Sequence, residues 1–430
     1  MTQGGGLLQL VAQGKQDVFL TGNPQITWFK MVYRRYTNFA MESSLIQFDN
    51  QPDFGRKITT VIPRKGDLLG ALWLEIELPA LKDSKTGKPL SYTNATAHAL
   101  IQEITVEIGE QEIDKQTGEW MELTSNYIVT EDKKQAWNNM IGKTTGASQG
   151  NTPAASVSLF GPLYLYVPLR FWFCKNPGLA LPLLALQYHP VRINVTLRPI
   201  QQMFIVDTPQ ASDVCDISAT SASITSMNLY GDFVHLDVDE RRRFVSNSHE
   251  YLIEQVQTTN SYPIDSTAST VQVPMEFNHP IRELYWVIQR SVAVNAHQWF
   301  NYTNLSIGEF VPPTSPSVFQ NLINTALLRL DGFDRFDKRN ADYFRLVQPY
   351  QYHTVIPIDD FVYSYSFCFR PEDTQPSGSM NASRIDSMTL QLELNNTVTP
   401  RRGPANVRIY ALNHNVLRIV DGFGGLLFRI

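Results

Sequence analysis

The segment Thr389–Leu394, with the sequence TLQLEL, alternates leucine with polar residues, so that its three leucines lie on one face of an extended chain. The segments Leu72–Leu78 (LWLEIEL) and Arg192–Leu197 (RINVTL) repeat this pattern. Alternation with a period of two residues predicts strands that have one buried face and one face open to solvent or to a partner. Such strands are typical of antiparallel sheets that pack face to face as a sandwich.

Candidate strands recur along the whole chain, eight in each half. In the first half they are 38–48, 57–63, 69–78, 104–114, 163–173, 181–189, 191–197 and 223–236. In the second half they are 250–258, 270–277, 281–290, 326–336, 362–370, 379–386, 388–395 and 407–419. The pattern therefore predicts an all-β chain made of two tandem eight-stranded sandwiches.

The two halves also resemble each other. Glu103–Lys115 and Ala326–Lys338 both read as a strand, a turn containing glycine, a strand end and then Asp-Lys. A duplicated unit explains this similarity, and the polar segment Leu236–Phe244 lies between the copies. We expect an N-terminal arm at 1–24, a first domain at 25–236, a linker at 237–248 and a second domain at 249–430.

Few segments depart from the strand pattern. Gly118–Gly142 places large apolar residues at helical spacing and predicts a helix. Gly142–Pro162 and Ser291–Gln320 are rich in Gly, Ser, Asn, Thr and Pro, which predicts long surface loops. The second loop contains His297–Ser306 (HQWFNYTNLS), whose aromatic residues suggest contact with a partner if they are exposed.

Composition excludes several classes of protein. The chain has 430 residues, a net charge of −5 and 43% hydrophobic residues, so it can bury large cores and lacks the basic excess of a duplex-coating protein. The three cysteines (Cys174, Cys215 and Cys368) are widely spaced, which favours a reducing compartment over a disulfide framework. No secretory signal is evident, and no apolar run approaches the roughly 20 residues of a membrane helix.

Enzyme motifs are absent from the sequence. His249-Glu250 begins an HExxH-like string, but position 253 is isoleucine, so a second zinc ligand is missing. Two groups of acidic residues are the remaining candidates. A calcium site could be formed by Asp331, Asp334 and Asp337, and paired catalytic carboxylates could come from Asp237, Asp239 and Glu240. The first does not match the spacing of a calcium loop and the second adjoins three arginines, so we expect solvated charges in both. We therefore expect no catalytic residue, no metal ligand and no cofactor.

Glycosylation sequons of the form N-x-[ST] occur at Asn94, Asn194, Asn301, Asn304, Asn381 and Asn395. Most are expected to be chance matches in a chain without a secretory signal. Asn301 and Asn304 lie in the expected surface loop and are kept as glycosylation candidates.

Pattern alone leaves two classes of function open. A tandem sandwich suits a viral coat protein, and it suits equally a jelly-roll lectin or glycan-processing enzyme. A lectin would present aromatic residues on a concave sheet face, usually with calcium. A glycan-processing enzyme would project two carboxylates into a cleft.

Several longer strings are more specific. The segment Gly4–Ser43 (GGGLLQLVAQGKQDVFLTGNPQITWFKMVYRRYTNFAMES) resembles the opening of the major capsid proteins of nucleocytoplasmic large DNA viruses, most closely their phycodnavirus and mimivirus members. Further segments fit the same family in the same order: Pro177–Ile193, His249–Gln257, Tyr343–Gln351, Gln375–Asp386 and Tyr410–Phe428. The loops at 142–162 and 291–320 match nothing in that family.

The resemblance implies a double jelly roll and a structural role without catalysis. It implies homotrimeric, pseudo-hexagonal capsomers that tile an icosahedral shell above an internal membrane, in virions assembled in the host cytoplasm. Neighbouring capsomers, minor capsid proteins and a penton protein at the vertices would be the partners, without direct contact to nucleic acid. In this family the N-terminal segment lies at the base of the capsomer, so Gly4–Gly22 is expected to act as an arm that binds minor capsid proteins or neighbouring capsomers.

Overall fold

The computed structural model describes residues 4–82, 89–144, 162–205, 222–304, 320–358, 360–395 and 403–428. By its internal contacts the chain divides into two units, Met1–Asn38 and Phe39–Ile430. The first unit contains two short helices, α1 (Gly5–Val11) and α2 (Val18–Thr21), and none of its described residues is buried. The separate N-terminal unit thus extends beyond the expected arm at 1–24, because the first strand begins only at Phe39.

The second unit begins with two antiparallel sheets. Sheet 1 has the strand order β1-β11-β3-β8, with β9 also paired to β3, and sheet 2 has the order β2-β10-β6-β7. Their strands are β1 (Phe39–Ile46), β2 (Lys57–Val61), β3 (Leu68–Leu78), β6 (Ile101–Ile108), β7 (Gln111–Thr117), β8 (Leu163–Pro168), β9 (Leu181–Pro182), β10 (Val191–Leu197) and β11 (Ser226–Leu236). A small separate pair consists of β4 (Leu81–Lys82) and β5 (Pro89–Leu90).

Two further antiparallel sheets follow. Sheet 3 has the order β12-β22-β15-β19, with β13, β20 and β23 at its margins, and sheet 4 has the order β14-β21-β16-β17, with β18 paired to β16. Their longer strands are β12 (His249–Thr258), β14 (Thr270–Met275), β15 (Pro280–Arg290), β16 (Ile323–Leu330), β19 (Tyr363–Ser366), β21 (Met388–Leu394) and β22 (Ala405–Val420). The shorter ones are β13 (Tyr262–Ile264), β17 (Phe333–Asp334), β18 (Arg339–Asn340), β20 (Met380–Asn381) and β23 (Phe423–Leu426).

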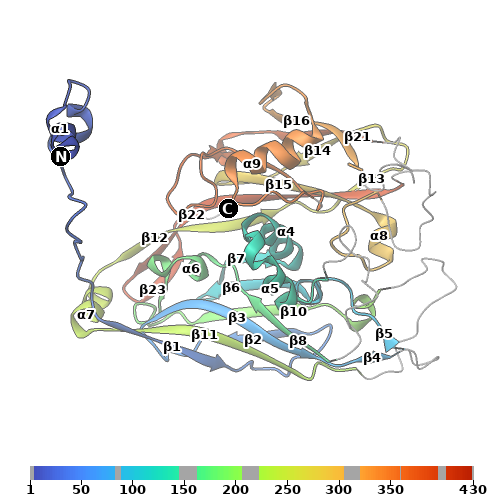
Figure 1. Cartoon of the computed structure of the whole chain (residues 1–430). Coiled ribbons are helices and arrows are strands. Elements are labelled where there is room, and N and C mark those ends of the chain that lie inside the picture. The colour runs from blue at the N-terminus through green and yellow to red at the C-terminus, as the bar shows by residue number, and fades with distance from the viewer. Residues whose placement is uncertain are drawn as a thin grey trace. The chain divides into compact units, whose positions relative to one another are not determined.

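The two sandwiches share one topology. The strands that form these four orders are β1, β2, β3, β6, β7, β8, β10 and β11 in the first sandwich, and β12, β14, β15, β16, β17, β19, β21 and β22 in the second. When each set is numbered 1 to 8 in chain order, sheets 1 and 3 both have the order 1-8-3-6, and sheets 2 and 4 both have the order 2-7-4-5. The first strand of each sandwich therefore pairs with its last, as β1 does with β11 and β12 with β22. Within Phe39–Ile430 the four sheets are layered, with helix α4 between sheets 2 and 3 (Figure 1). The predicted all-β fold of two tandem eight-stranded sandwiches, a double jelly roll, is confirmed.

The remaining helices are short and lie mostly in connections. They are α3 (Thr96–Leu100), α4 (Gly118–Ile128), α5 (Glu131–Ile141), α6 (Trp172–Lys175), α7 (Val238–Ser246), α8 (Ser291–Asn295) and α9 (Gln348–Tyr352), with 3₁₀ turns at Pro177–Leu179, Ile200–Gln202 and Ala382–Arg384 and a π-helical turn at Tyr343–Val347. The predicted helix Gly118–Gly142 is in fact two helices, because Val129 and Thr130 are extended between α4 and α5. Helix α7 lies in the expected linker. No helix within the described ranges is long and apolar enough to cross a membrane.

Each sandwich encloses an apolar core. The three leucines of Thr389–Leu394 are buried in the second core, as their alternation predicts. The predicted strand at 181–189 is wrong beyond β9: residues 182–186 form successive turns, with the N–H groups of Ala185 and Leu186 bonded to the carbonyls of Pro182 and Leu183. An apolar run with proline in it packs here without forming a strand.

Candidate functional site at the junction of the two sandwiches

Helix α4 connects the two sandwiches, since it follows β7 and packs on sheet 3 (Figure 1). It begins after Thr117, whose side-chain oxygen accepts a hydrogen bond from the Trp120 N–H at 3.2 Å. A Cβ atom on Gly118 would lie 1.9 Å from the carbonyl oxygen of His98. Glycine at the first residue of the helix therefore lets α4 approach the first sandwich closely.

One side of α4 is aromatic. Trp120, Leu123 and Tyr127 recur at helical spacing and are buried. The Trp120 ring lies 5.4 Å from that of Tyr285 on β15 and 5.6 Å from that of Tyr410 on β22. The other buried members of this cluster are Val287, Tyr302, Phe361, Val362 and Leu412. One apolar cluster thus contains residues of both sandwiches, and each aromatic pair adds roughly 0.5–1.5 kcal/mol beyond the burial of its area.

A bidentate salt bridge crosses the junction beside this cluster. Arg408 Nε lies 2.5 Å from Glu119 Oε2, and its Nη2 lies 2.6 Å from Oε1. The hydroxyl of Tyr302 donates to Oε1 at 2.8 Å, and that of Tyr410 donates to Oε2. Burial alone would raise the pKa of Glu119, but Arg408 and the hydroxyls hold this pKa below its ordinary value. Arg408 also donates to Gln289 Oε1 at 2.6 Å.

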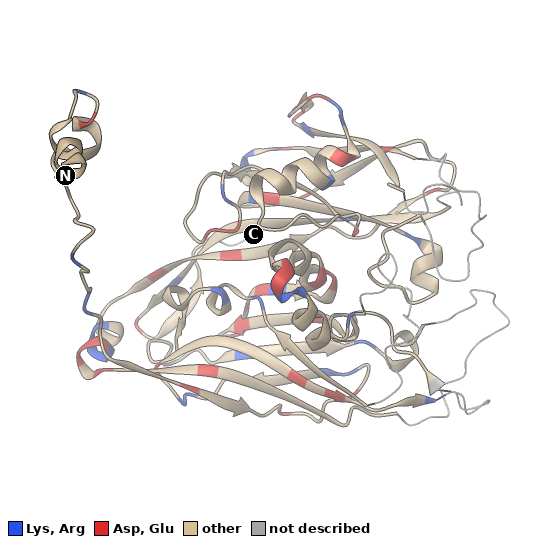
Figure 2. Ribbon diagram, in the orientation of Figure 1, with Lys and Arg blue, Asp and Glu red and all other residues tan. Residues whose placement is uncertain are grey.

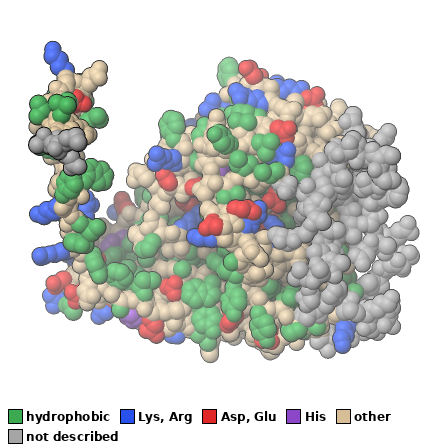
Figure 3. Space-filling model, viewed as in Figure 1, with side chains coloured by type: hydrophobic (Ala, Val, Ile, Leu, Met, Phe, Trp, Pro, Cys, Tyr) green, Lys and Arg blue, Asp and Glu red, His purple; other side chains and the backbone are tan. Residues whose placement is uncertain are grey.

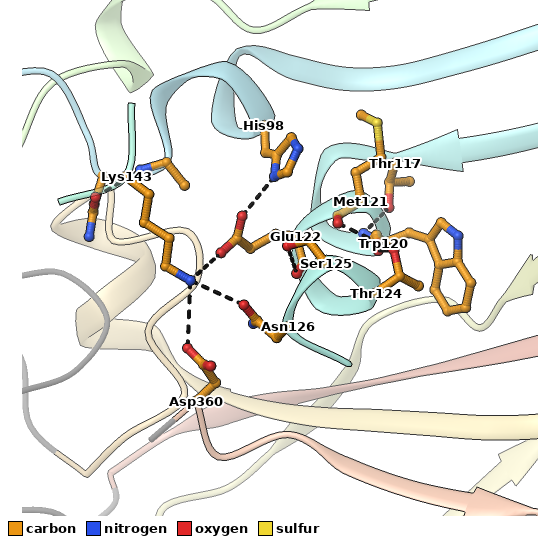
Figure 4. A network of polar contacts seen from close by, with 12 residues as sticks. His98, Thr117, Trp120, Met121, Glu122, Thr124, Ser125, Asn126, Lys143 and Asp360 are labelled. Carbon is orange, nitrogen blue, oxygen red and sulfur yellow. Dashed lines mark hydrogen bonds and ion pairs between the residues drawn. The ribbon is translucent and has the colours of Figure 1, made fainter. Parts of the chain in front are cut away.

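A second polar network lies on another side of α4 (Figure 4). Glu122 Oε2 is 2.7 Å from His98 Nδ1, and Glu122 Oε1 is 2.7 Å from Lys143 Nζ. The same ammonium donates to Asn126 at 3.2 Å and lies 3.8 Å from Asp360, which belongs to the second half of the chain. Burial would raise the pKa of Glu122, but Lys143 and His98 outweigh it and lower this pKa to about 2. The carboxylate is therefore ionised at neutral pH.

A histidine lies between two carboxylates beside α4. His353 Nε2 lies 2.5 Å from Glu283 Oε1, and His353 Nδ1 lies 3.1 Å from Glu372 Oε1. Its ring centroid is 4.6 Å from that of Tyr127 on α4. Burial lowers the pKa of His353, but the two carboxylates outweigh it and raise this pKa to about 9. The imidazolium form, with an N–H for each carboxylate, therefore prevails at neutral pH.

The sandwiches also meet along β7 and β12. Glu254 on β12 accepts from Lys175 of the first sandwich at 2.6 Å and from Arg282 of the second at 2.8 Å. Against the effect of burial, these cations lower the pKa of Glu254 to about 2. Asp114 on β7 accepts from the Val256 N–H at 3.0 Å. Three residues of the second sandwich belong to the first core: Ile253, Leu417 and Ile419.

These contacts fix one sandwich against the other. Each junction carboxylate described above pairs with a cation or accepts a hydrogen bond from a hydroxyl or a backbone N–H. The arrangement therefore suits a structural role better than proton transfer. The sequence analysis singled out none of these residues. The available signal was Glu119 and Glu122 among the apolar residues of a predicted helix. Arg408, the partner of Glu119, lies 289 residues further on, so the sequence gives no sign of the pair.

The acidic candidates from the sequence do not converge. Within the described residues, no group of three or more His, Cys, Asp or Glu side chains is placed to hold a metal ion. Asp334 pairs with Arg329 at 2.8 Å, and Asp331 Oδ1 accepts from the Ser387 N–H at 2.8 Å. Asp237 accepts from the N–H of Val238 at the start of α7. These carboxylates have local structural partners.

The glycosylation candidates are placed differently from expectation. Asn301 is 4% exposed and Asn304 is fully buried. Asn301 Nδ2, the atom that would carry a glycan, donates to Gln298 Oε1 at 2.7 Å. The neighbouring Tyr302 is buried in the junction, so the aromatics of this segment pack inward instead of facing a partner. The rest of the expected loop, 305–319, and most of the loop at 142–162 lie outside the described residues, as does Cys215.

Two surfaces expose apolar side chains. In the N-terminal unit these side chains are 64–98% exposed: Leu7, Leu8, Leu10, Val11, Val18, Phe19, Leu20, Ile26, Trp28, Phe29, Met31, Val32, Tyr33 and Tyr36. On sheet 1 the outward positions, given by strand register, include Met41, Leu45, Trp73, Tyr164, Tyr166 and Tyr230. Hydrophobic side chains are visible on both surfaces in the space-filling view (Figure 3). Apolar surface of this extent is typical of a site that another molecule covers.

Two family models match the chain. Residues 27–237 match the model described as the N-terminus of major capsid proteins, and residues 240–425 match the model of the large eukaryotic DNA virus major capsid protein. This chain belongs to the major capsid proteins of large eukaryotic DNA viruses. As a major capsid protein it forms the capsid shell of the virion.

Individual relatives extend over its full length. The chain is 40% identical to the major capsid protein of Pyramimonas orientalis virus and 37% identical to that of Phaeocystis pouchetii virus, with 99% of both chains covered in each case. It is 36% identical to the major capsid protein of Paramecium bursaria Chlorella virus 1, again with 99% of each chain covered. The resemblance identified in the sequence is thereby confirmed.

Solved structures of capsid proteins share the fold. The PBCV-1 protein VP54 aligns with a TM-score of 0.77 and 32% identity over 94% of this chain and 100% of VP54. The Faustovirus major capsid protein aligns with a TM-score of 0.73 at 15% identity, over 95% of this chain and 94% of that protein, which shows the shared fold alone. The two-sandwich fold of this chain is therefore shared with other capsid proteins.

Proposed function

We propose that three copies of this capsid protein form a homotrimeric capsomer with a pseudo-hexagonal outline, and that these capsomers tile the icosahedral shell of a large double-stranded DNA virus. The role is structural and involves no catalysis. One observation carries the proposal: a single chain holds two sandwiches of identical strand order against each other. Three such chains supply six similar blocks, so a threefold oligomer can occupy a position of nearly sixfold symmetry in a lattice.

The junction supports this role physically. A block that tiles a shell must keep the angle between its two sandwiches constant, and buried ion pairs fix geometry because breaking one is costly. Two such pairs cross between the sandwiches beside α4: Glu119 with Arg408, and Lys143 with Asp360. The aromatic cluster beside them packs apolar side chains of the two sandwiches against each other. Both features favour a rigid two-sandwich unit.

The outward face of sheet 1 is the proposed contact with a second copy. Tyr164 is 61% and Met41 is 63% exposed on this face, and stable subunit interfaces commonly bury roughly 2,000 Å² or more. Strands β1 and β8 form the edges of the sheet, and edges of this kind are usually covered in the assembled state. A neighbouring subunit would cover both the face and its edges.

The N-terminal unit is the proposed contact for minor capsid proteins or neighbouring capsomers. Its apolar side chains are exposed, and Lys30, Arg34 and Arg35 accompany them between Ile26 and Tyr36. Exposed apolar segments of this kind gain stability when a partner buries them. In the assembled virion a penton protein would occupy the vertices and an internal membrane would lie beneath the shell. Assembly would take place in the host cytoplasm.

Direct binding of nucleic acid is not part of the proposal. Figure 2 shows lysine and arginine interspersed with acidic residues along the described ribbon. With a net charge of −5 the chain offers no general attraction to phosphate backbones.

Two variants test the proposed interface on sheet 1. Tyr164→Lys and Met41→Lys place charge on the outward face of sheet 1, and we expect them to leave the monomer folded and to dissociate the trimer. Tyr350→Lys on α9, where the wild-type side chain is also exposed, is the matched control and should leave the trimer intact. Trimers unaffected by the sheet 1 variants would refute this interface.

Deletion of residues 2–22 tests the arm. We expect trimers of normal mass that fail to assemble further or to bind minor capsid proteins. If trimers and shells both formed normally, the proposed role of the arm would be wrong.

A further inference from the structure

A pocket of about 420 Å³ opens in the second sandwich. Leu252 on β12 and Val416 on β22 are directly paired across the sheet, and both line it. Pro280 at the start of β15 and Phe428 near the C-terminus supply further apolar wall. A volume of this size falls within the range of small-molecule sites in proteins.

The polar lining of this pocket is basic or neutral. Arg384, His279 and His414 line it, together with asparagine and serine side chains, and no carboxylate does. Arg384 is exposed, and within the described residues no ion pair or hydrogen bond is found for its guanidinium. The fixed charge among the lining side chains is therefore positive, and Glu254, the carboxylate that acts on His414, is itself paired with Lys175 and Arg282.

His414 supplies a second, independent observation. It is 8% exposed, and neither of its ring nitrogens has a hydrogen-bond partner among the described residues. A buried polar group without a partner is unfavourable, so a ligand that bonds to it gains affinity. Burial and nearby Arg282 lower the pKa of His414 against the opposing effect of Glu254, which keeps the ring neutral with one N–H to donate.

We propose that this pocket binds a small anionic amphiphile, with its hydrocarbon part against Leu252, Val416 and Phe428 and its anionic group near Arg384 and His414. A carboxylate and a phosphate monoester share this chemistry, because both present acceptor oxygens to a guanidinium and to an imidazole N–H. A short acyl chain would fill the apolar side of the pocket.

Calorimetric titration of the purified full-length chain tests the proposal, with octanoate, octyl phosphate, octan-1-ol and octylamine as probes. We expect saturable binding of one or both anions, at least 10-fold tighter than that of octan-1-ol, and weaker binding still of octylamine. The two anionic probes distinguish a carboxylate ligand from a phosphate ligand. Binding of octan-1-ol as tight as that of both anions, or no saturable binding of either anion, would overturn the proposal.

Two variants locate the binding. Arg384→Gln removes the charge at an exposed position and should weaken anion binding about 10-fold. Leu252→Trp should fill the pocket from its rim and abolish binding of every probe, while an unchanged melting temperature confirms the fold. Arg335→Gln alters another exposed arginine and is the control expected to bind like the wild type. Equal anion affinity in Arg384→Gln and Arg335→Gln would contradict the proposal.

Discussion

Glu119 on α4 and Arg408 on β22 lie 289 residues apart in the chain and form a bidentate salt bridge across the junction of the two sandwiches. The carboxylate is 14% and the guanidinium 20% exposed, so water screens their attraction only weakly. Two tyrosine hydroxyls complete the shell of the carboxylate. This pair ties the first sandwich to the second at the point where α4 meets sheet 3.

Removal of the cation from this pair should destabilise the protein strongly. Arg408→Met leaves Glu119 buried without its counter-charge, and we expect a loss of about 3–5 kcal/mol in the free energy of unfolding, measured by chemical denaturation. Arg418→Met is the matched control on the same strand, because Arg418 is half exposed and lies 3.5 Å from Glu250. The control should lose less than about 1 kcal/mol. Equal losses in the two variants would contradict the role given to Arg408.

Substitution of Gly118 should also be costly. A Cβ atom there would lie 1.9 Å from the carbonyl oxygen of His98 and 2.3 Å from that of Ile101, so α4 must move away from backbone atoms. We expect Gly118→Ala to cost about 3 kcal/mol, although alanine normally favours helix formation. Gly332→Ala has open space for a Cβ but a positive φ, and it should cost about 1 kcal/mol. A neutral or stabilising Gly118→Ala would show that the close approach is unimportant.

Acid should weaken the junction. Glu122 and Glu254 have folded-state pKa values of about 2, below the ordinary value of 4.5. The ionised form of each therefore stabilises the folded state by about 3 kcal/mol above about pH 4.5. This contribution to the free energy of unfolding is lost as the pH falls towards 2. Unfolding measured between pH 5 and pH 2.5 should show this decline. Glu122→Gln should flatten the curve over that interval, and a curve as steep as that of the wild type would count against the depressed pKa of Glu122.

Alkali should act through a different residue. The folded-state pKa of His353 is about 9, above the ordinary value of 6.5, so its contribution is present in full below about pH 6.5 and is lost as the pH rises through 9. The loss should reach about 3 kcal/mol between pH 6.5 and pH 9.5. His353→Gln should be less stable at pH 6.5 and should lack this alkaline decline. A wild-type stability that does not change over this interval would contradict the assignment.

The sheets could be predicted from the sequence because their cause is local. In Thr389–Leu394 every second residue is a leucine, and all three leucines face the second core. The segment at 181–189 failed because an apolar run without alternation packs equally well as turns, and Pro182 lacks the N–H that a central strand would use. The helix at 118–142 was predicted in the right place, but its break was missed, although Thr130 followed by Glu131 and Asp132 is a typical helix start.

The junction could not be predicted in the same way. Its pairs join residues such as Glu119 and Arg408, or Lys143 and Asp360, that are distant in the chain, and no spacing rule relates them. Asn301 and Asn304 were expected in a surface loop because their neighbours in the sequence are polar. Both side chains are buried and bond to nearby residues, Asn301 Nδ2 to Gln298 Oε1 and Asn304 Oδ1 to the N–H of Gln320.

The solution mass of the purified chain, measured by light scattering coupled to size exclusion, tests the central claim most directly. The chain has a mass of 48.8 kDa, so a homotrimeric capsomer predicts a stable species of three times that mass that persists on dilution. Its images in negative stain should have hexagonal outlines. A species that remains at 48.8 kDa at all concentrations would contradict self-assembly of the chain into capsomers.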